Sequence, residues 1–188
     1  MEISKKNSFL EFVKKYGIYA VVGFVVFAVA LTFTLAATLG GVTPTSTTPV
    51  LTFALPMENV MVVKDYSATE LQKNETLNQW EAHMAVDLTS QNSDVFAILD
   101  GEVVSVDYDF LEGNVVKIKH ANGFTSEYSS LSNENLINVG AKVSAGQKIG
   151  EASQSASSEL ELGSHLHFAM KLNDKLVDPN DYLDLQQK

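Results

Sequence analysis

Short stretches of alternating apolar and polar residues follow one another over the last three quarters of the chain, with turn residues every eight to twelve positions. Alternation with a period of two is typical of half-buried β-strands. Residues 95–99 end at Asp100-Gly101, a two-residue turn signal that favours a hairpin. A second hairpin is predicted over residues 114–128, around an Ala-Asn-Gly turn. The pattern therefore predicts a mainly β domain, an antiparallel β-sandwich or open barrel.

Two further segments complete the strand pattern. Residues 143–150 hold two glycines around a short strand, and residues 165–172 form a strand that turns back at an Asn-Asp pair. One short helix is also predicted, because Ser67 and Glu70 form a capping box ahead of residues 71–77.

An uncharged and largely apolar segment covers residues 16–39. At about 1.5 Å per residue it reaches roughly 36 Å, which is enough to cross a hydrocarbon core of about 30 Å. A cleaved signal peptide is the alternative, but its apolar region runs over only about 7–15 residues. The segment therefore predicts an uncleaved transmembrane helix.

Charge asymmetry predicts the orientation of that helix. Four lysines precede the segment, and none follows it until Lys64. Positive flanks stay in the cytoplasm, so the rest of the chain is expected outside. The predicted organisation is a cytoplasmic tail (1–15), a transmembrane helix (16–39), a Gly/Thr/Pro spacer (40–50) and an extracytoplasmic β-domain (51–188).

Composition narrows the function of the outer domain. The chain carries a net charge of −10, and its 13 basic residues are all lysine, so a nucleic-acid partner is not expected. There is no cysteine, which excludes disulfides and thiolate metal sites. A metal ion would have to be held by Asp, Glu or one of the four histidines.

Three of the four histidines fall in two short motifs. His83 and Asp87 are four residues apart, and His165 and His167 are two apart. Residues two apart on a strand share a face, and a spacing of four shares a face on a helix or a strand. Two histidines and one carboxylate are a sufficient catalytic zinc set, with the fourth position left to water. We expect the two motifs to meet in one zinc site.

The sequence around these motifs resembles a known family. The segments WEAHMAVDL, VFAILDGEVVSV, GNVVKIKHANGFTSEYSSL, VGAKVSAGQKIG and SHLHFAMKLNDKLVDPNDYL are similar in order and spacing to those of the lysostaphin-type (LytM-like) zinc metalloendopeptidases. The match covers about residues 53–185. Because this family cuts peptide cross-links of bacterial peptidoglycan, the resemblance implies a zinc-dependent, peptidase-like β-domain.

The resemblance also implies a role for each motif residue. His83, Asp87 and His167 correspond to the three zinc ligands, and His165 corresponds to a catalytic histidine that faces the zinc-bound water. A further catalytic histidine belongs in the family's Tyr-x-His-Leu block, where this chain has Ser130. A serine hydroxyl does not take up a proton near neutral pH, and the loss of such a group typically costs about 10²–10⁴ in rate.

The fourth histidine is not expected to replace the missing one. The turn pairs His120 roughly with Phe124, which leaves Ser130 about 20 Å along the returning strand. Ala85 is a second departure, since the family usually has glycine in its His-x-Gly-x-Asp block. Alanine there requires an ordinary backbone conformation or a slight shift of the ligand pair.

At a finer level, the anchor, the spacer and the segment FALPMENVMVVKDYS resemble a membrane-anchored group of this family in sporulating bacteria. In that group the domain projects from the forespore membrane into the space between two membranes and binds a partner membrane protein of the mother cell. The resemblance implies a zinc-binding scaffold of a sporulation channel complex with reduced or no hydrolytic activity. Peptidoglycan is a further expected partner, and the chain is expected to form an oligomer.

Two alternatives stay open from the sequence. One is an active, tethered zinc endopeptidase that cleaves peptidoglycan cross-links, which three intact ligands and His165 would support. The other is a membrane-anchored β-domain whose histidines are incidental polar residues.

Overall fold

The computed structural model describes residues 12, 14–19, 21–28 and 51–185. The chain separates into two units, Met1–Val50 and Leu51–Lys188. In the first unit, residues 14–19 and 21–28 are helical. Among the described residues, no helix is both long enough and apolar enough to span a bilayer. Half of the predicted transmembrane segment 16–39 lies outside the described residues, and the segment stays a prediction.

The second unit is mainly β, as the alternating pattern predicts. Its strands are β1 (Met61–Lys64), β2 (Ser67–Asn74), β3 (Gln79–His83), β4 (Val86–Thr89), β5 (Asp94–Phe96), β6 (Gly101–Asp109), β7 (Gly113–His120), β8 (Phe124–Leu131), β9 (Lys142–Val143), β10 (Lys148–Glu151), β11 (Leu166–Leu172) and β12 (Lys175–Val177). Two short 3₁₀ helices lie between strands, η1 (Ala121–Gly123) and η2 (Ser157–Leu162), and a third, η3 (Pro179–Asp181), follows β12.

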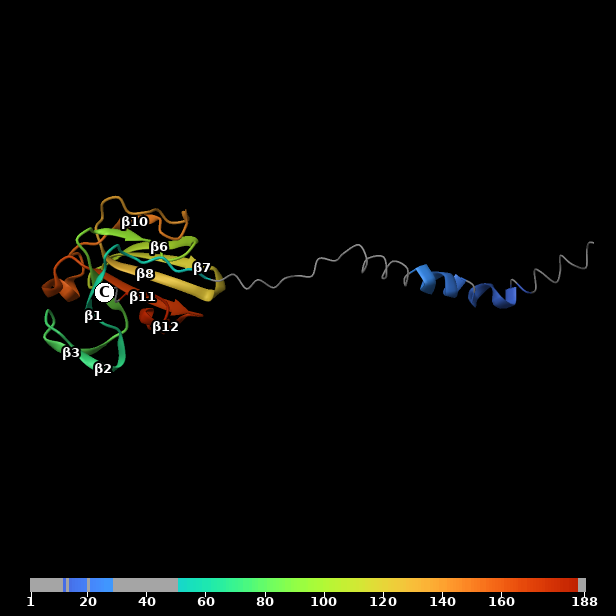
Figure 1. The fold of residues 1–188 in the computed structure, drawn as a ribbon, viewed down its shortest axis with the longest axis horizontal. Helices are drawn as coiled ribbons and strands as arrows, with labels where there is room; N and C mark the ends of the chain where they lie inside the picture. The colour runs from blue at the N-terminus through green and yellow to red at the C-terminus, as the bar shows by residue number, and fades with distance from the viewer. Residues whose placement is uncertain (1–11, 13, 20, 29–50, 186–188) are drawn as a thin grey trace, which may run out of the picture. The chain divides into compact units, whose positions relative to one another are not determined.

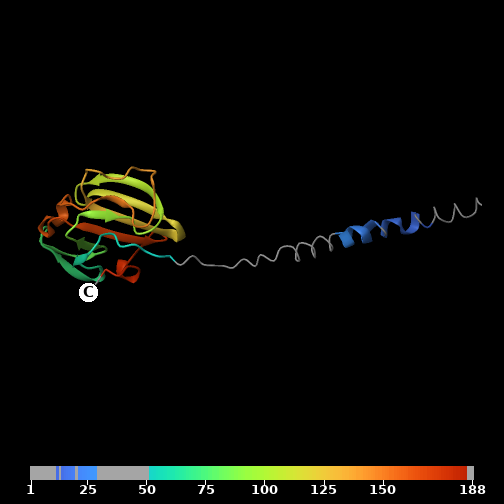
Figure 2. The same cartoon turned by 45° about the horizontal axis from the view of Figure 1, so that its top comes forward.

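Most of these strands form one antiparallel sheet in the order β1-β4-β11-β8-β7-β6-β9, with β12 also paired to β11. The long strands β6, β7, β8 and β11 lie side by side across this sheet (Figure 1). Two small sheets, β10-β5 and β2-β3, complete the unit. The β2–β3 hairpin lies at the edge of the unit, away from the long strands (Figure 2). The predicted hairpins β7–β8 and β11–β12 are confirmed.

One face of the main sheet carries the hydrophobic core. Along β11, Leu166, Phe168 and Met170 are buried at alternate positions, and Val86 and Leu88 of β4 are buried beside them. Because successive side chains of a strand point to opposite faces, the residues between them point away from this core. Those residues include Asp87 of the first motif and His167 of the second.

The hairpin predicted at Asp100-Gly101 is wrong. β5 pairs with β10, while β6 pairs with β7 and β9. A Cβ atom on Gly101 would lie 2.7 Å from the carbonyl oxygen of Lys119 on β7. Glycine is therefore required at this position because β6 and β7 approach each other closely, and not because the chain makes a tight turn.

The short helix predicted after Ser67 is also wrong. The backbone N–H of Glu70 does donate to Ser67 Oγ at 2.9 Å, as a capping box would. The segment nevertheless forms β2, and its pairing with β3 shifts register between Ser67 and Leu71. Leu71 is 61% exposed, so no core lies where an apolar helix face would pack. The local hydrogen bond occurs in an irregular strand and not at a helix start.

The segment 143–150 also differs from the prediction of one short strand. It contains parts of two strands, β9 and β10, separated by a turn at Gly146, whose φ is +77°. Glycine adopts this left-handed conformation without steric cost.

Candidate metal centre

Strand pairing brings Asp87 and His167 together. The two residues lie opposite one another in the antiparallel register of β4 and β11. Their neighbours Val86, Leu88 and Phe168 are buried in the core, so both side chains point to the other face of the sheet. His167 Nδ1 lies 2.7 Å from Asp87 Oδ1.

His83 ends β3 and reaches the same point across a short turn. Its Nε2 atom lies 3.2 Å from Asp87 Oδ2. Its Nδ1 lies 2.9 Å from the carbonyl oxygen of Asp65, which can only accept a hydrogen bond. The ring proton therefore sits on Nδ1, and the Nε2 lone pair faces the cluster. Ala85 in the turn is not among the described residues with positive φ, so its backbone is ordinary.

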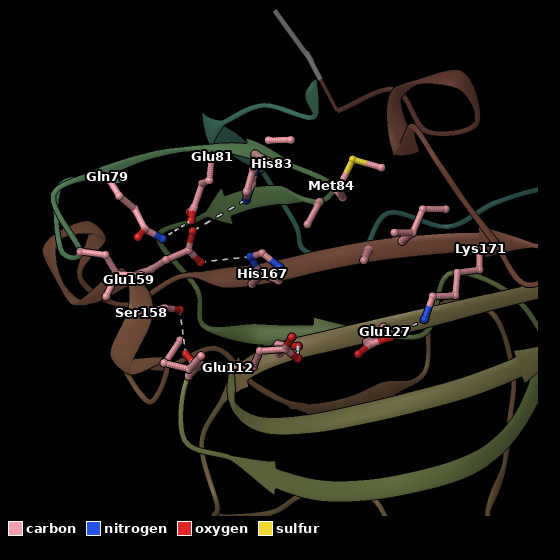
Figure 3. Close-up of a pocket in the computed structure, with 18 residues that line it drawn as sticks. Gln79, Glu81, His83, Met84, Glu112, Glu127, Ser158, Glu159, His167 and Lys171 are labelled. Atoms are coloured by element: carbon pink, nitrogen blue, oxygen red, sulfur yellow. Dashed lines mark hydrogen bonds and ion pairs between the residues drawn. The ribbon is translucent and has the colours of Figure 1, made fainter. Parts of the chain in front are cut away.

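A second carboxylate enters the site, and it was not predicted from the sequence. Glu159, in η2, places Oε2 at 3.1 Å from His167 Nδ1 and Oε1 at 3.8 Å from His83 Nε2. Figure 3 shows this side chain reaching between the two imidazoles. The local sequence, Ser-Ser-Glu-Leu-Glu, does not distinguish Glu159 from Glu161. Its proximity in sequence to the His-x-His pair is the one signal that could have found it.

His165 reaches the cluster through the same carboxylate. It lies just before β11, where it forms an isolated bridge with Ser153. Its Nδ1 donates to the carbonyl oxygen of Gly163 at 2.9 Å, and its Nε2 lies 3.5 Å from Glu159 Oε2. Both imidazoles of the His-x-His pair thus face one site, as a spacing of two residues predicts. His165 is only 1% exposed, so it lies under the cluster and not in open solvent.

Buried carboxylates and imidazoles set one another's charge. Burial alone would lower the pKa of His167, but hydrogen bonds to Asp87 and Glu159 outweigh it and raise this pKa to about 10. Burial would raise the pKa values of the two carboxyl groups, but their contacts with the imidazoles hold both pKa values below the ordinary range. Without a metal, His167 is therefore a cation between two carboxylates at neutral pH.

Three buried polar atoms of the site lack a hydrogen-bond partner among the described residues: His83 Nε2, Asp87 Oδ2 and His165 Nε2. Such atoms are costly inside a protein, and a cation would satisfy them. One ligand atom each from His83, Asp87, Glu159 and His167 lie within 4.8 Å of one another. The nitrogen–oxygen contacts between these four side chains, counted over both oxygens of each carboxylate, span 2.7–3.8 Å. A tetrahedral zinc ion with bonds of about 2.0–2.1 Å spaces its ligand atoms by about 3.3 Å. The residues therefore fit zinc.

A cleft of about 420 Å³ opens over this cluster. The charged residues that line this cleft are mostly acidic (Figure 3). They are Glu81, Glu112, Glu127 and Glu159, together with one lysine, Lys171. Such a cleft disfavours anionic ligands by charge repulsion.

Ser130, at the position of the missing histidine, does not line the cleft. It is fully buried with φ of +60°. Its hydroxyl donates to the carbonyl oxygen of Ser153 at 2.9 Å, and Ser153 Oγ donates back to the Ser130 carbonyl oxygen at 3.0 Å. Its neighbour Ser129 lies opposite His167 in the sheet and does line the cleft.

His120 lies apart from the cluster, as the pairing of the β7–β8 hairpin predicts. It is buried at the end of β7, with Nδ1 at 3.0 Å from the carbonyl oxygen of Asp100 and Nε2 at 2.7 Å from Ser126 Oγ. Burial lowers its pKa. It is therefore a neutral side chain with structural hydrogen bonds.

The sequence of this chain is similar to that of a known sporulation protein. Stage II sporulation protein Q of Bacillus subtilis (strain 168) is 33% identical over 137 residues, which cover 68% of this chain and 48% of that protein. The chain thus spans about half the length of this curated relative.

Two solved structures share the fold. The structure of the SpoIIQ-SpoIIIAH pore forming complex aligns with a TM-score of 0.61 and 29% identity, covering 72% of this chain and 92% of that one. The catalytic domain of the antimicrobial peptidase lysostaphin from Staphylococcus simulans aligns with a TM-score of 0.54 and 27% identity, covering 66% and 92%. The model of Peptidase family M23 matches residues 81–179, more than half of the chain and a range that includes both histidine motifs. The chain belongs to peptidase family M23.

Proposed function

We propose that this chain is a zinc-binding M23 module with reduced or no hydrolytic activity, which acts as a scaffold in a sporulation complex between two membranes. The observation that carries the loss of activity is Ser130. At the position of a catalytic histidine, this hydroxyl is buried and already bonded to the Ser153 carbonyl oxygen. It can neither reach a substrate in the cleft nor move a proton near neutral pH.

Zinc is the metal that these residues would hold, through His83, Asp87 and His167. The donor set of two imidazoles and carboxylate oxygens is typical of zinc sites. The Asp65 carbonyl oxygen would orient His83 through Nδ1, as outer-shell acceptors do for metal-bound imidazoles. Bound zinc would supply Lewis-acid chemistry. Proton transfer would fall to His165, whose Nε2 faces Glu159.

A membrane anchor at residues 16–39 and a partner membrane protein belong to the same proposal. The uncharged apolar run and the lysines before it support the anchor and an extracytoplasmic domain. The similarity to SpoIIQ, solved in a complex with SpoIIIAH, supports a partner of that kind in the mother cell membrane.

Peptidoglycan digestion tests the loss of activity. We expect the zinc-loaded chain to release soluble fragments from purified peptidoglycan about 10²–10⁴ times more slowly than an M23 peptidase with a complete histidine set, because one proton-transfer group is missing. The measurement is fragment release per mole of zinc-loaded protein. A rate similar to that of the complete peptidase would refute the proposal.

Two histidine variants are useful controls for this assay. Ser130→His restores the family residue but forces an imidazole into a fully buried site, which typically costs about 1–3 kcal/mol. Ser129→His instead places an imidazole on the lining of the cleft. Both are compared with wild type after their folding is checked by circular dichroism.

Co-purification tests the scaffold role. When the chain is co-expressed with the SpoIIIAH-type protein of its own organism, we expect the two to elute together as a stable complex. The catalytic domain of lysostaphin, which shares the fold, is the control and should not bind. Separate elution of the two proteins at micromolar concentration would contradict the scaffold proposal.

Zinc affinity should depend on pH with a defined sign. His167 carries a proton up to a pKa of about 10, and zinc must displace that proton to bind. The apparent affinity should therefore rise by about tenfold per pH unit between about pH 6.5 and 8.5. Competition with a chelator of known pH dependence measures this slope. A flat profile over this range would show that no ligand proton is displaced.

A further inference from the structure

We propose that Glu159 is a fourth protein ligand, which closes the zinc site formed with His83, Asp87 and His167 and is held in place by Lys64. The inference rests on the proposed zinc binding and assigns a ligand outside both histidine motifs. A site with four protein ligands is of the structural type, whereas a catalytic site keeps one position for water or substrate.

The position of the carboxylate carries the proposal. Glu159 Oε2 lies 3.1 Å from His167 Nδ1, and Oε1 lies 3.8 Å from His83 Nε2. The separation between Oε2 and His167 Nδ1 is close to the roughly 3.3 Å expected between two ligand atoms of one tetrahedral ion. The contact through Oε1 shows that the carboxylate also faces His83. The residue is only 6% exposed, so its carboxylate has left water for this site. An ionised group buried to this degree needs cationic partners to compensate its desolvation, and Lys64 contacts its Oε1 atom but not Oε2.

The backbone around Glu159 is fixed on both sides. Ser158 donates to the carbonyl oxygen of Leu111 through its backbone N–H at 3.1 Å and through Oγ at 2.8 Å. On the other side, the backbone N–H of Glu161 donates to Thr76 Oγ1 at 3.0 Å. Glu159 itself departs from helical geometry within η2, with φ of −136° and ψ of 31°. The segment is therefore docked on two turns of the fold, and the carboxylate is presented from a defined backbone.

Lys64 fixes one oxygen of this carboxylate, and the other oxygen faces the imidazoles of His165 and His167. Its Nζ donates to Glu159 Oε1 at 3.0 Å, and its side chain is only 9% exposed. Lys64 lies opposite Asp87 in the register of β1 and β4, so the sheet itself positions the lysine. With Oε1 bonded to Lys64, Oε2 is the oxygen available to a metal. An ammonium donor behind a ligating carboxylate is the kind of outer-shell partner that orients metal ligands.

The first test measures zinc affinity of the full-length chain by competition with a chelator. Glu159→Gln keeps the shape of the side chain but removes its charge, and we expect it to weaken zinc binding by about 100-fold, the upper range for changes around a metal site. Lys64→Met should weaken binding by about 10-fold, because the ligand is no longer oriented. Glu161→Gln removes an equal charge two residues away on an exposed side chain and should leave the affinity unchanged.

The second test asks whether the site has an open position. The wild-type chain is loaded with Co²⁺, whose visible absorption depends on coordination number, and is titrated with imidazole at a pH where imidazole is neutral, so that the acidic cleft does not repel it. We expect no spectral change in the wild type, because four protein ligands leave imidazole no position. Glu159→Ala, loaded in the same way, should change its spectrum on imidazole addition, because a position has been opened.

The outcomes separate this inference from the proposed function. A wild-type chain that binds neither Zn²⁺ nor Co²⁺ overturns both. A wild-type chain that binds zinc with an affinity that Glu159→Gln does not alter overturns only the fourth ligand, and so does a Co²⁺-loaded wild type that binds imidazole. If the Glu159 variants fail to fold, imidazole binding by the wild type still overturns the fourth ligand, and Lys64→Met takes their place as the comparison.

Discussion

Replacing His167 by alanine is expected to remove the metal from the chain. His167 Nδ1 is the atom shared by the two carboxylates, at 2.7 Å from Asp87 and 3.1 Å from Glu159. Without this imidazole, two buried carboxylates face each other with no nitrogen ligand between them. We expect about one zinc per chain in the wild type and essentially none in His167→Ala or His83→Ala after dialysis, measured by elemental analysis.

His120→Gln is the matched control for this experiment. His120 is buried and hydrogen-bonded like the site histidines, but its partners are Asp100 and Ser126 and not the cluster. The variant should therefore retain its zinc. Zinc binding at this cluster would be excluded by either of two results. In one, the wild-type chain contains no zinc after purification from zinc-replete medium. In the other, the His167→Ala chain retains its zinc.

The largest loss of stability is expected from Phe168→Ala. Phe168 is fully buried in β11, between β4 and β8, and its ring centroid lies 5.2 Å from that of Tyr128. Deleting a buried phenyl ring leaves a cavity and typically costs about 3–5 kcal/mol. Urea unfolding of the metal-free chain measures this cost, since chelation removes the separate contribution of a bound ion.

Phe110→Ala provides the comparison for that loss. Phe110 carries the same side chain on the turn between β6 and β7, where it is 70% exposed. Its replacement should change the free energy of unfolding by less than about 0.5 kcal/mol, as is usual for surface positions. Equal losses for the two phenylalanine variants would show that the core does not have the packing described here.

The parts of the site that could be predicted from sequence are those set by strand geometry. Asp87 and His167 meet because alternation along two paired strands places both on the face opposite the core. The family resemblance adds His83, four residues before Asp87. The face on which each strand residue lies follows from periodicity, which is a local property and therefore visible in the sequence.

The parts that could not be predicted depend on contacts between distant segments. Glu159 reaches the cluster because η2 docks on the β6–β7 turn and the β2–β3 turn, and neither contact leaves a sequence signal. The burial of Ser130 depends likewise on its pairing with Ser153. The helix after Ser67 was predicted wrongly because a capping hydrogen bond is local, whereas the absence of a core beside Leu71 is not.

The docking of η2 has a further consequence for the mechanics of the domain. An ion bound by His83, Asp87, Glu159 and His167 would cross-link β3, β4, η2 and β11 at a single point. Closing so many loops with one bridge restricts the unfolded chain far more than a bond between neighbours in sequence does. A bound metal would thus cross-link the rim of the cleft. The stiffness of this rim would then depend on how much zinc is available, whereas the stiffness of the sheet beneath it would not.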